Sequence, residues 1–139
     1  IYRVPTAGGP VQQITATADV AEGDALPAPA GDAVAIAHKK RGAAQTNIAI
    51  IDAGTVRLLT DEADPSFNWQ AVAFVEGGKA LIANRAQTAG AEGSVWRIDV
   101  ATGAAKQLIG RKGVVYAAAG ASADGSRIAI TSDEGSGQD

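Results

Sequence analysis

The feature that most constrains the fold of this chain is a repeat of 47 residues. Three apolar runs start at Ile1, Ile48 and Val95, so each begins 47 residues after the one before. Three glycines that precede further apolar runs keep the same spacing, at Gly31, Gly78 and Gly125. Two independent marks with one period indicate three copies of one structural unit, at residues 1–47, 48–94 and 95–139.

Each repeat contains about four short apolar runs separated by turn residues. In the middle copy, the run at residues 48–51 is followed by Ala53 and Gly54 and then by a returning run at 56–60, which is the pattern of a hairpin. A polar loop follows each hairpin, at residues 16–24, 61–68 and 110–113. An alanine-rich run such as 70–74 or 116–119 comes next, and a glycine turn then leads into the fourth run.

Helix is the competing interpretation, because 31 of the 139 residues are alanine, the best helix former. It fails because no apolar stretch continues for about 10–12 residues without glycine or proline, and the 3.6-residue period is absent. Four strands in a repeat of this length are typical of a β-propeller blade. We therefore expect an all-β fold, a β-propeller segment of three four-stranded blade repeats. The chain should open with the outer half of one blade and close with the inner half of another.

Charge and composition exclude several classes of protein. The net charge of −3 argues against nucleic-acid binding, which needs a basic surface. The absence of cysteine excludes disulfides and thiolate metal sites. No apolar run approaches the length of a membrane span, and no basic-then-apolar leader opens the sequence. We expect a soluble bacterial-type protein, cytoplasmic or periplasmic, that does not associate with membranes.

The sequence offers little catalytic chemistry. The closest approach to a G-x-S-x-G nucleophile elbow surrounds Ser122, but it lacks the closing glycine and leads into a strand. His38 is the only histidine, so neither a Ser-His-Asp triad nor a zinc site of the usual nitrogen and sulfur ligands can be assembled. We expect no catalytic residue, no metal and no cofactor in these 139 residues.

Five polar residues stand as weak ligand-contact candidates. Asp61, Glu62 and Asp64 share a polar loop that lacks the alternation and glycine of a calcium loop, so a solvated loop is the alternative. His38 and Arg85 occupy the same position in successive repeats, near the end of a strand, where a structural role is the alternative. For the two tryptophans, Trp69 and Trp96, we expect packing between blades.

Two segments carry a resemblance to a known family. Residues 121–132, A-S-A-D-G-S-R-I-A-I-T-S, resemble the S-P-D-G-K-x-I-A-F-x-S signature of the TolB-like propeller repeat. Residues 1–15, I-Y-R-V-P-T-A-G-G-P-V-Q-Q-I-T, resemble the partner hairpin signature of the same repeat. The residue pattern of that hairpin is most similar to the hairpins in propellers of prolyl oligopeptidase-family serine peptidases.

The resemblance implies a propeller that caps a catalytic cavity, admits short peptides and excludes folded proteins. The catalytic α/β-hydrolase domain would lie outside this chain, so the chain alone would not be an enzyme, although its parent would be a hydrolase. The expected partners are the remaining propeller and the hydrolase domain, or a second copy of the chain, with peptides as ligands. A TolB-like scaffold for protein partners and a purely structural fragment remain the alternatives.

Overall fold

The computed structural model describes residues 1–135, which form twelve strands and one short 3₁₀ helix. The N-terminal hairpin consists of β1 (Tyr2–Arg3) and β2 (Gln12–Gln13). The first sheet consists of β3 (Val20–Pro27), β4 (Val34–Lys40), β5 (Asn47–Asp52) and β6 (Thr55–Leu58). The second sheet consists of β7 (Phe67–Val75), β8 (Ala80–Gln87), β9 (Gly93–Asp99) and β10 (Ala105–Gly110), with η1 (Glu76–Gly78) between β7 and β8. The C-terminal pair consists of β11 (Tyr116–Ala121) and β12 (Ile128–Ser132).

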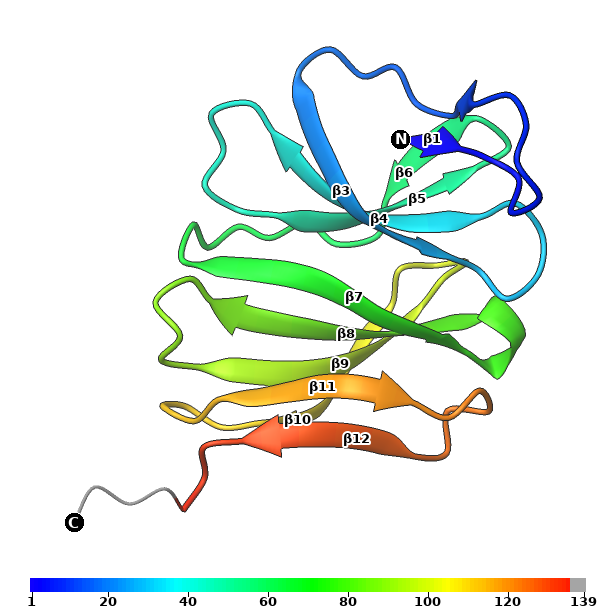
Figure 1. Cartoon of the computed structure of the whole chain (residues 1–139). Coiled ribbons are helices and arrows are strands. Elements are labelled where there is room, and N and C mark those ends of the chain that lie inside the picture. The colour runs from blue at the N-terminus through cyan, green and yellow to red at the C-terminus, as the bar shows by residue number, and fades with distance from the viewer. Residues whose placement is uncertain (136–139) are drawn as a thin grey trace.

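Both four-stranded sheets are antiparallel meanders, in which every strand pairs with its neighbour in sequence. The units stack in chain order, with the N-terminal hairpin against the first sheet and the C-terminal pair beneath the second sheet (Figure 1). The two ends of the chain therefore lie at opposite ends of the stack. The sequence prediction of an all-β fold is confirmed.

Small and branched side chains fill the space between the first and second sheets. The apolar cluster there consists of Ala35, Ile48, Ile50, Leu59, Trp69, Leu81, Ala83 and Ile98. Ala35 and Ala83 are completely buried, as are Ala49 and Ala80 elsewhere in the core. Because an alanine side chain ends at Cβ, these positions let the two sheets approach closely while still excluding water.

A second apolar cluster joins the second sheet to β11, and an amide clamp reinforces it. The side chain of Asn84 on β8 donates to the carbonyl oxygen of Ala118 at 3.1 Å and accepts from its N–H at 2.7 Å. The N–H of Gly93 donates to the carbonyl oxygen of Val114, which lies two residues before β11, at 3.0 Å. These contacts fix the C-terminal pair against the face of the second sheet.

The repeated glycines occupy the turns expected of them. Gly31, Gly78 and Gly125 have φ angles of 77°, 92° and 74°, in the left-handed region that favours glycine. Each lies in the connection between the first two strands of its unit. The prediction that glycine makes this turn in every repeat is confirmed.

The predicted polar loops are too long: β7 begins at Phe67, inside the loop predicted at 61–68, and β10 includes Gly110, the first residue of the loop predicted at 110–113. Residues 16–24 were expected to form a polar loop, but β3 begins at Val20 and includes Asp24. The pairing of β3 with β4 is irregular between Gly23 and Leu26, and Asp24 has a φ of 47°. Because of this irregularity, apolar and polar residues do not alternate along β3, so the sequence does not show the pattern that predicts a strand. The alanine-rich run at 70–74 is likewise part of the longer strand β7.

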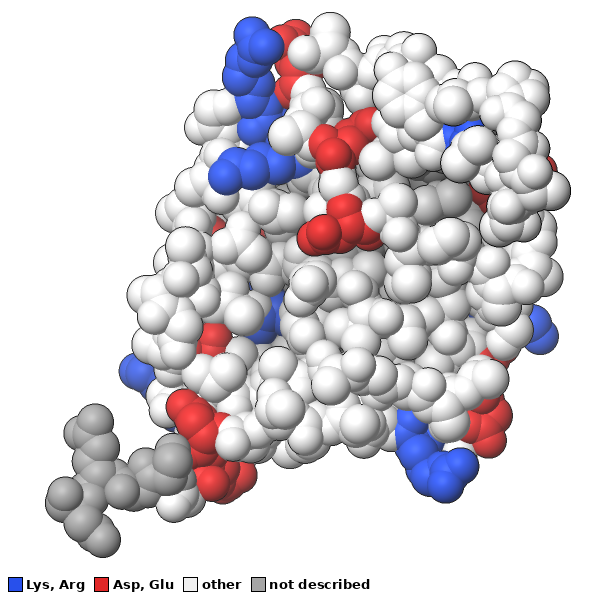
Figure 2. Space-filling view, in the orientation of Figure 1, with Lys and Arg blue, Asp and Glu red and all other residues white. Residues whose placement is uncertain are grey.

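Charged side chains are scattered over the face drawn in Figure 2, with acidic and basic residues interspersed. Within residues 1–135, no helix is long and apolar enough to cross a membrane.

Gly93 provides a test of the close approach between the second sheet and β11. A Cβ at this position would lie 2.9 Å from the carbonyl oxygen of Tyr116, whereas a Cβ at Gly120 would meet nothing within 4 Å. We expect Gly93→Ala to lower the free energy of unfolding by about 1–3 kcal/mol because the backbone must move apart. Gly120→Ala should change it by less than about 1 kcal/mol. Urea denaturation of both variants measures the difference, and equal stability would contradict the close contact.

Candidate functional site

The loop that joins the first sheet to the second carries Glu62, the acidic partner of a partly buried ion pair. Both carboxylate oxygens of Glu62 accept hydrogen bonds from the guanidinium of Arg85 on β8, at 2.7 Å from Nε and 2.9 Å from Nη2. The side chains of Glu62 and Arg85 are only 6% and 24% exposed. A bidentate pair with little exposure is far stronger than a single contact on the surface.

Aromatic rings surround this ion pair. The indole N–H of Trp69 donates to Glu62 at 2.8 Å, and the guanidinium carbon of Arg85 lies 3.7 Å from the centre of the Phe67 ring. Trp96 packs edge-on against Trp69 with 5.4 Å between ring centroids. We call Glu62, Phe67, Trp69, Arg85 and Trp96 the Glu62 cluster. The rings shield the charges from water, and the cation–π contact adds to the stability of the guanidinium there.

The backbone of the loop is also fastened to the first sheet. The amide oxygen of Asn47 on β5 accepts from the N–H of Glu62 at 2.8 Å and from the hydroxyl of Thr60 at 2.9 Å. The amide nitrogen of Gln45 donates to the carbonyl oxygen of Glu62 at 3.3 Å. The Glu62 cluster therefore joins two sheets through one residue, with its backbone held by one sheet and its side chain by the other.

Hydrogen bonding keeps two of the loop carboxylates ionised. The hydrogen bonds from Arg85 lower the pKa of Glu62 below its ordinary value of 4.5, in opposition to burial, which raises it. The hydroxyl and N–H of Ser66 lower the pKa of Asp64, which closes a turn with Ser66 and is exposed. Asp64 therefore stabilises the turn of the loop through its hydrogen bonds with Ser66.

His38 and Asp61 both line a small hollow that adjoins the Glu62 cluster. It has a volume of about 140 Å³, and its lining also includes Lys40, Gln45 and Glu62. His38 lies in β4, two residues before the strand ends at Lys40, and only 8% of its surface is exposed. Of the five sequence candidates, the structure thus brings Glu62 to Arg85 and His38 to Asp61, and it places Asp64 apart in its turn. Contact of any of these residues with a ligand stays a prediction.

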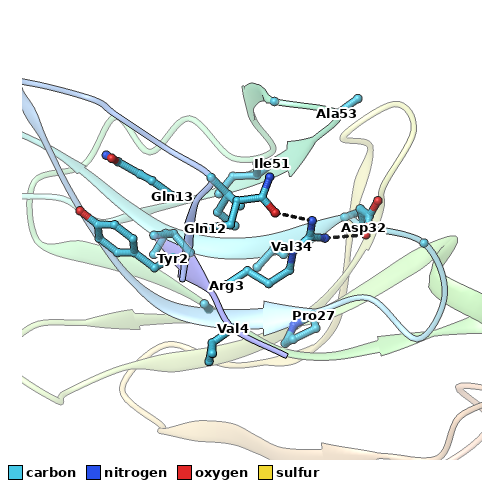
Figure 3. A pocket seen from close by; sticks show the side chains of 16 residues that line it. Tyr2, Arg3, Val4, Gln12, Gln13, Pro27, Asp32, Val34, Ile51 and Ala53 are labelled. Atoms are coloured by element: carbon cyan, nitrogen blue, oxygen red, sulfur yellow. Dashed lines mark hydrogen bonds and ion pairs between the residues drawn. The ribbon is translucent and has the colours of Figure 1, made fainter. Parts of the chain in front are cut away.

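A groove of about 590 Å³ that was not expected from the sequence lies beside the N-terminal hairpin. Its walls come from β1 and β2 on one side and from β3 and β4 on the other (Figure 3). Arg3 crosses it, donating to Asp32 at 2.8 Å and to Gln12 at 2.8 Å. Tyr2 and Val4 are 65% and 55% exposed at its rim. The alternation of Tyr2 and Val4 around Arg3 was the signal available in the sequence.

Ser122 is fully engaged in a turn. Its hydroxyl donates to the carboxylate of Asp124 at 2.6 Å and accepts from the N–H of Arg127 at 3.0 Å. The hydrogen bond from Ser122 is the largest influence lowering the pKa of Asp124, to about 2. This arrangement is that of a polar turn between two strands. Among the described residues, no group of three histidine, cysteine or acidic side chains is placed to hold a metal ion.

Comparisons with known proteins give one informative result. No protein-family profile and no curated protein matches the chain. A solved structure described as oligogalacturonate lyase in complex with manganese is similar with a TM-score of 0.61 and 18% sequence identity, over 90% of this chain and 33% of that chain. The chain thus spans one third of that protein. The similarity supports a propeller-like fold and carries no statement about activity.

The Glu62 cluster predicts a pH-dependent stability. We expect Glu62→Gln to lower the free energy of unfolding by about 1–3 kcal/mol at neutral pH, because the amide cannot accept both guanidinium bonds. Since the folded pKa of Glu62 lies below 4.5, the contribution of the carboxylate is fully present above that pH and is lost as pH falls through the folded pKa. The difference between variant and parent should therefore shrink on acidification.

The adjacent exposed carboxylate is the matched control. Asp61→Asn removes the same charge from the same loop and should change stability by less than about 0.5 kcal/mol. Thermal unfolding of the three proteins between neutral and acidic pH measures both effects. Equal losses for the two variants, or a difference that persists in acid, would contradict the role of the ion pair.

Proposed function

We propose that this chain is the propeller portion of a prolyl oligopeptidase-family serine peptidase, where it gates the access of peptides to a catalytic domain outside residues 1–139. The observation that carries the proposal is the architecture itself, two complete four-stranded sheets between two half sheets. The proposal of this peptidase family in particular rests on the resemblance of the hairpin at residues 1–15 to its propellers.

A gate of this kind needs a stiff wall, and the observed packing suits that need. The sheets are joined by dry apolar clusters, by the Asn84 clamp and by the Glu62 cluster. Such joints resist separation of the sheets, because opening them exposes apolar surface and leaves buried polar groups without partners. Short peptides would then be selected by passage through the assembled propeller, while the chain itself performs no bond cleavage.

The alternative is a TolB-like scaffold that binds protein partners. It is favoured by the small hollow of His38 and Asp61, which is lined by polar side chains of the first sheet and of the following loop. Under this alternative no hydrolase domain accompanies the propeller. Oligogalacturonate and manganese belong to the description of the similar structure.

A serine-reactive fluorophosphonate probe tests where catalysis lies. We expect no labelling of the 139-residue chain and no cleavage of peptidyl p-nitroanilides, because the Ser122 hydroxyl is held in its turn. Labelling of the full-length gene product at a serine outside residues 1–139 would support the peptidase. A full-length product without a reactive serine would favour the scaffold, and stoichiometric labelling of Ser122 would overturn the proposal. Ser122→Ala is the control for labelling at that site.

A further inference from the structure

His38 is a buried side chain without a partner. Only 8% of the residue is exposed, yet no hydrogen bond or ion pair within residues 1–135 involves its imidazole ring. Every fully buried side-chain nitrogen or oxygen in that part of the chain has a hydrogen-bond partner, so the ring nitrogens of His38 must reach solvent. They reach it through the hollow of about 140 Å³ that His38 lines. An imidazole in this position is free to bond to a ligand.

The repeat shows which kind of group this place accepts. Arg85 stands one repeat after His38, and there the loop residue Glu62 supplies a carboxylate to the guanidinium. The residue one repeat before Glu62 is Thr15, which has no carboxylate and whose hydroxyl donates to Glu22. The first sheet therefore has the nitrogen base of this arrangement and lacks the acid that pairs with it.

Two further nitrogen donors lie on the same face of the first sheet as His38. Lys40 follows two residues later on β4, and Asn47 on β5 is directly opposite His38. Both residues line the hollow. Neither the ammonium of Lys40 nor the amide nitrogen of Asn47 has a hydrogen-bond partner among the described residues. An ammonium, an imidazole and an amide nitrogen together form a donor set for an anion.

Three carboxylates lie near these donors, and two of them are already bonded within the protein. Glu62 lines the hollow, but both of its oxygens accept from Arg85. Glu22 is opposite His38 on β3, but it lies outside the lining and accepts hydrogen bonds from two threonine hydroxyls. The third carboxylate is that of Asp61, which is exposed and lines the hollow. Asp61 should therefore oppose the binding of an anion.

The hollow belongs to the first sheet and its following loop, and not to the ends of the chain. All of its lining residues lie between His38 and Glu62 in the sequence. At the equivalent place in the second repeat, where the preceding sheet is complete, the side chain of Arg85 is still 24% exposed. A complete preceding blade therefore leaves this place accessible.

We propose that His38, Lys40 and Asn47 bind the carboxylate group of a small ligand in this hollow. The ligand carboxylate takes the place at His38 that Glu62 takes at Arg85, and the ammonium of Lys40 compensates its charge. A hollow of about 140 Å³ has room for a carboxylate with a few carbon atoms, which is the size of a small organic acid or of the last residue of a peptide. The site does not depend on the proposed function.

An NMR titration tests the site directly, because His38 is the only histidine and its ring resonances are identified without further assignment. Sodium propionate is added at constant pH and ionic strength. The ring resonances should shift to saturation with a dissociation constant of about 1–10 mM, as expected for so small a ligand. Propionamide has the same shape without the charge and should not shift them. The absence of a saturable shift with propionate, or equal shifts with both compounds, overturns the proposal.

Two neighbouring lysines separate binding in the hollow from a general effect of positive charge. Lys40→Gln should weaken propionate binding about three- to tenfold, because it removes the ammonium at the hollow. Lys39→Gln is the matched control, since Lys39 is also exposed, points to the opposite face of β4 and does not line the hollow. Equal effects of the two variants overturn the site.

Asp61→Asn gives a change in the opposite direction. It should strengthen propionate binding about two- to threefold by removing a negative charge from the lining. Weaker binding to this variant overturns the site. Circular dichroism verifies that all three variants are folded.

N-acetylalanine distinguishes the two sources of the carboxylate, because it carries both the carboxylate and the amide of a peptide C-terminus. Binding at least as tight as that of propionate supports a site for the end of a peptide. Binding of propionate alone supports a site for a free organic acid. Failure of both acids to bind overturns the site and leaves the proposed peptidase in place, since that proposal is tested by the reactive serine outside residues 1–139.

Discussion

Every part of this structure depends on burying both faces of each inner sheet against a neighbouring sheet. The second sheet contributes Leu81 and Ala83 to one apolar cluster and Ala80 and Ile82 to the other, and all four are at most 1% exposed. Adjacent residues along one strand point to opposite faces, so a continuous apolar run is the sequence that this position demands. A single sheet of this composition would expose one apolar face, and stacking removes that cost.

The Glu62 cluster shows that polar contacts also help to hold two sheets against each other. A charged pair buried among aromatic rings contributes little net stability compared with an apolar equivalent, but it tolerates only one geometry. Because Glu62 is bonded through its backbone to the first sheet and through its side chain to the second, that geometry sets how the two sheets are positioned. The apolar cluster supplies the attraction between the sheets, and the ion pair selects one alignment.

The sequence was sufficient to predict the strands, the hairpins and the glycine turns, because each follows from local pattern repeated at a fixed period. The contact between Glu62 and Arg85 could not be predicted, since it joins a loop to a strand 23 residues later and leaves no periodic mark. The irregular strand β3 was mistaken for a loop in its first half because Gly23 and Asp24 interrupt its alternation. His38 and Arg85 share a repeat position, yet Arg85 pairs with Glu62 of the preceding loop, whereas His38 only shares a hollow with Asp61, so equivalent places in the fold carry different chemistry.

The Asn84 clamp makes the stack mechanically uneven. Its amide bonds to the N–H and carbonyl of Ala118 act as a short rung of backbone-like hydrogen bonding between two units that share no extended ladder. The corresponding residue of the first sheet is Ala37, which cannot form such a rung. A shearing force along the strands would therefore meet directional hydrogen bonds at the joint below the second sheet. At the joint between the first and second sheets, the corresponding strand position carries only the methyl group of Ala37, and directional bonds come instead from the loop residue Glu62.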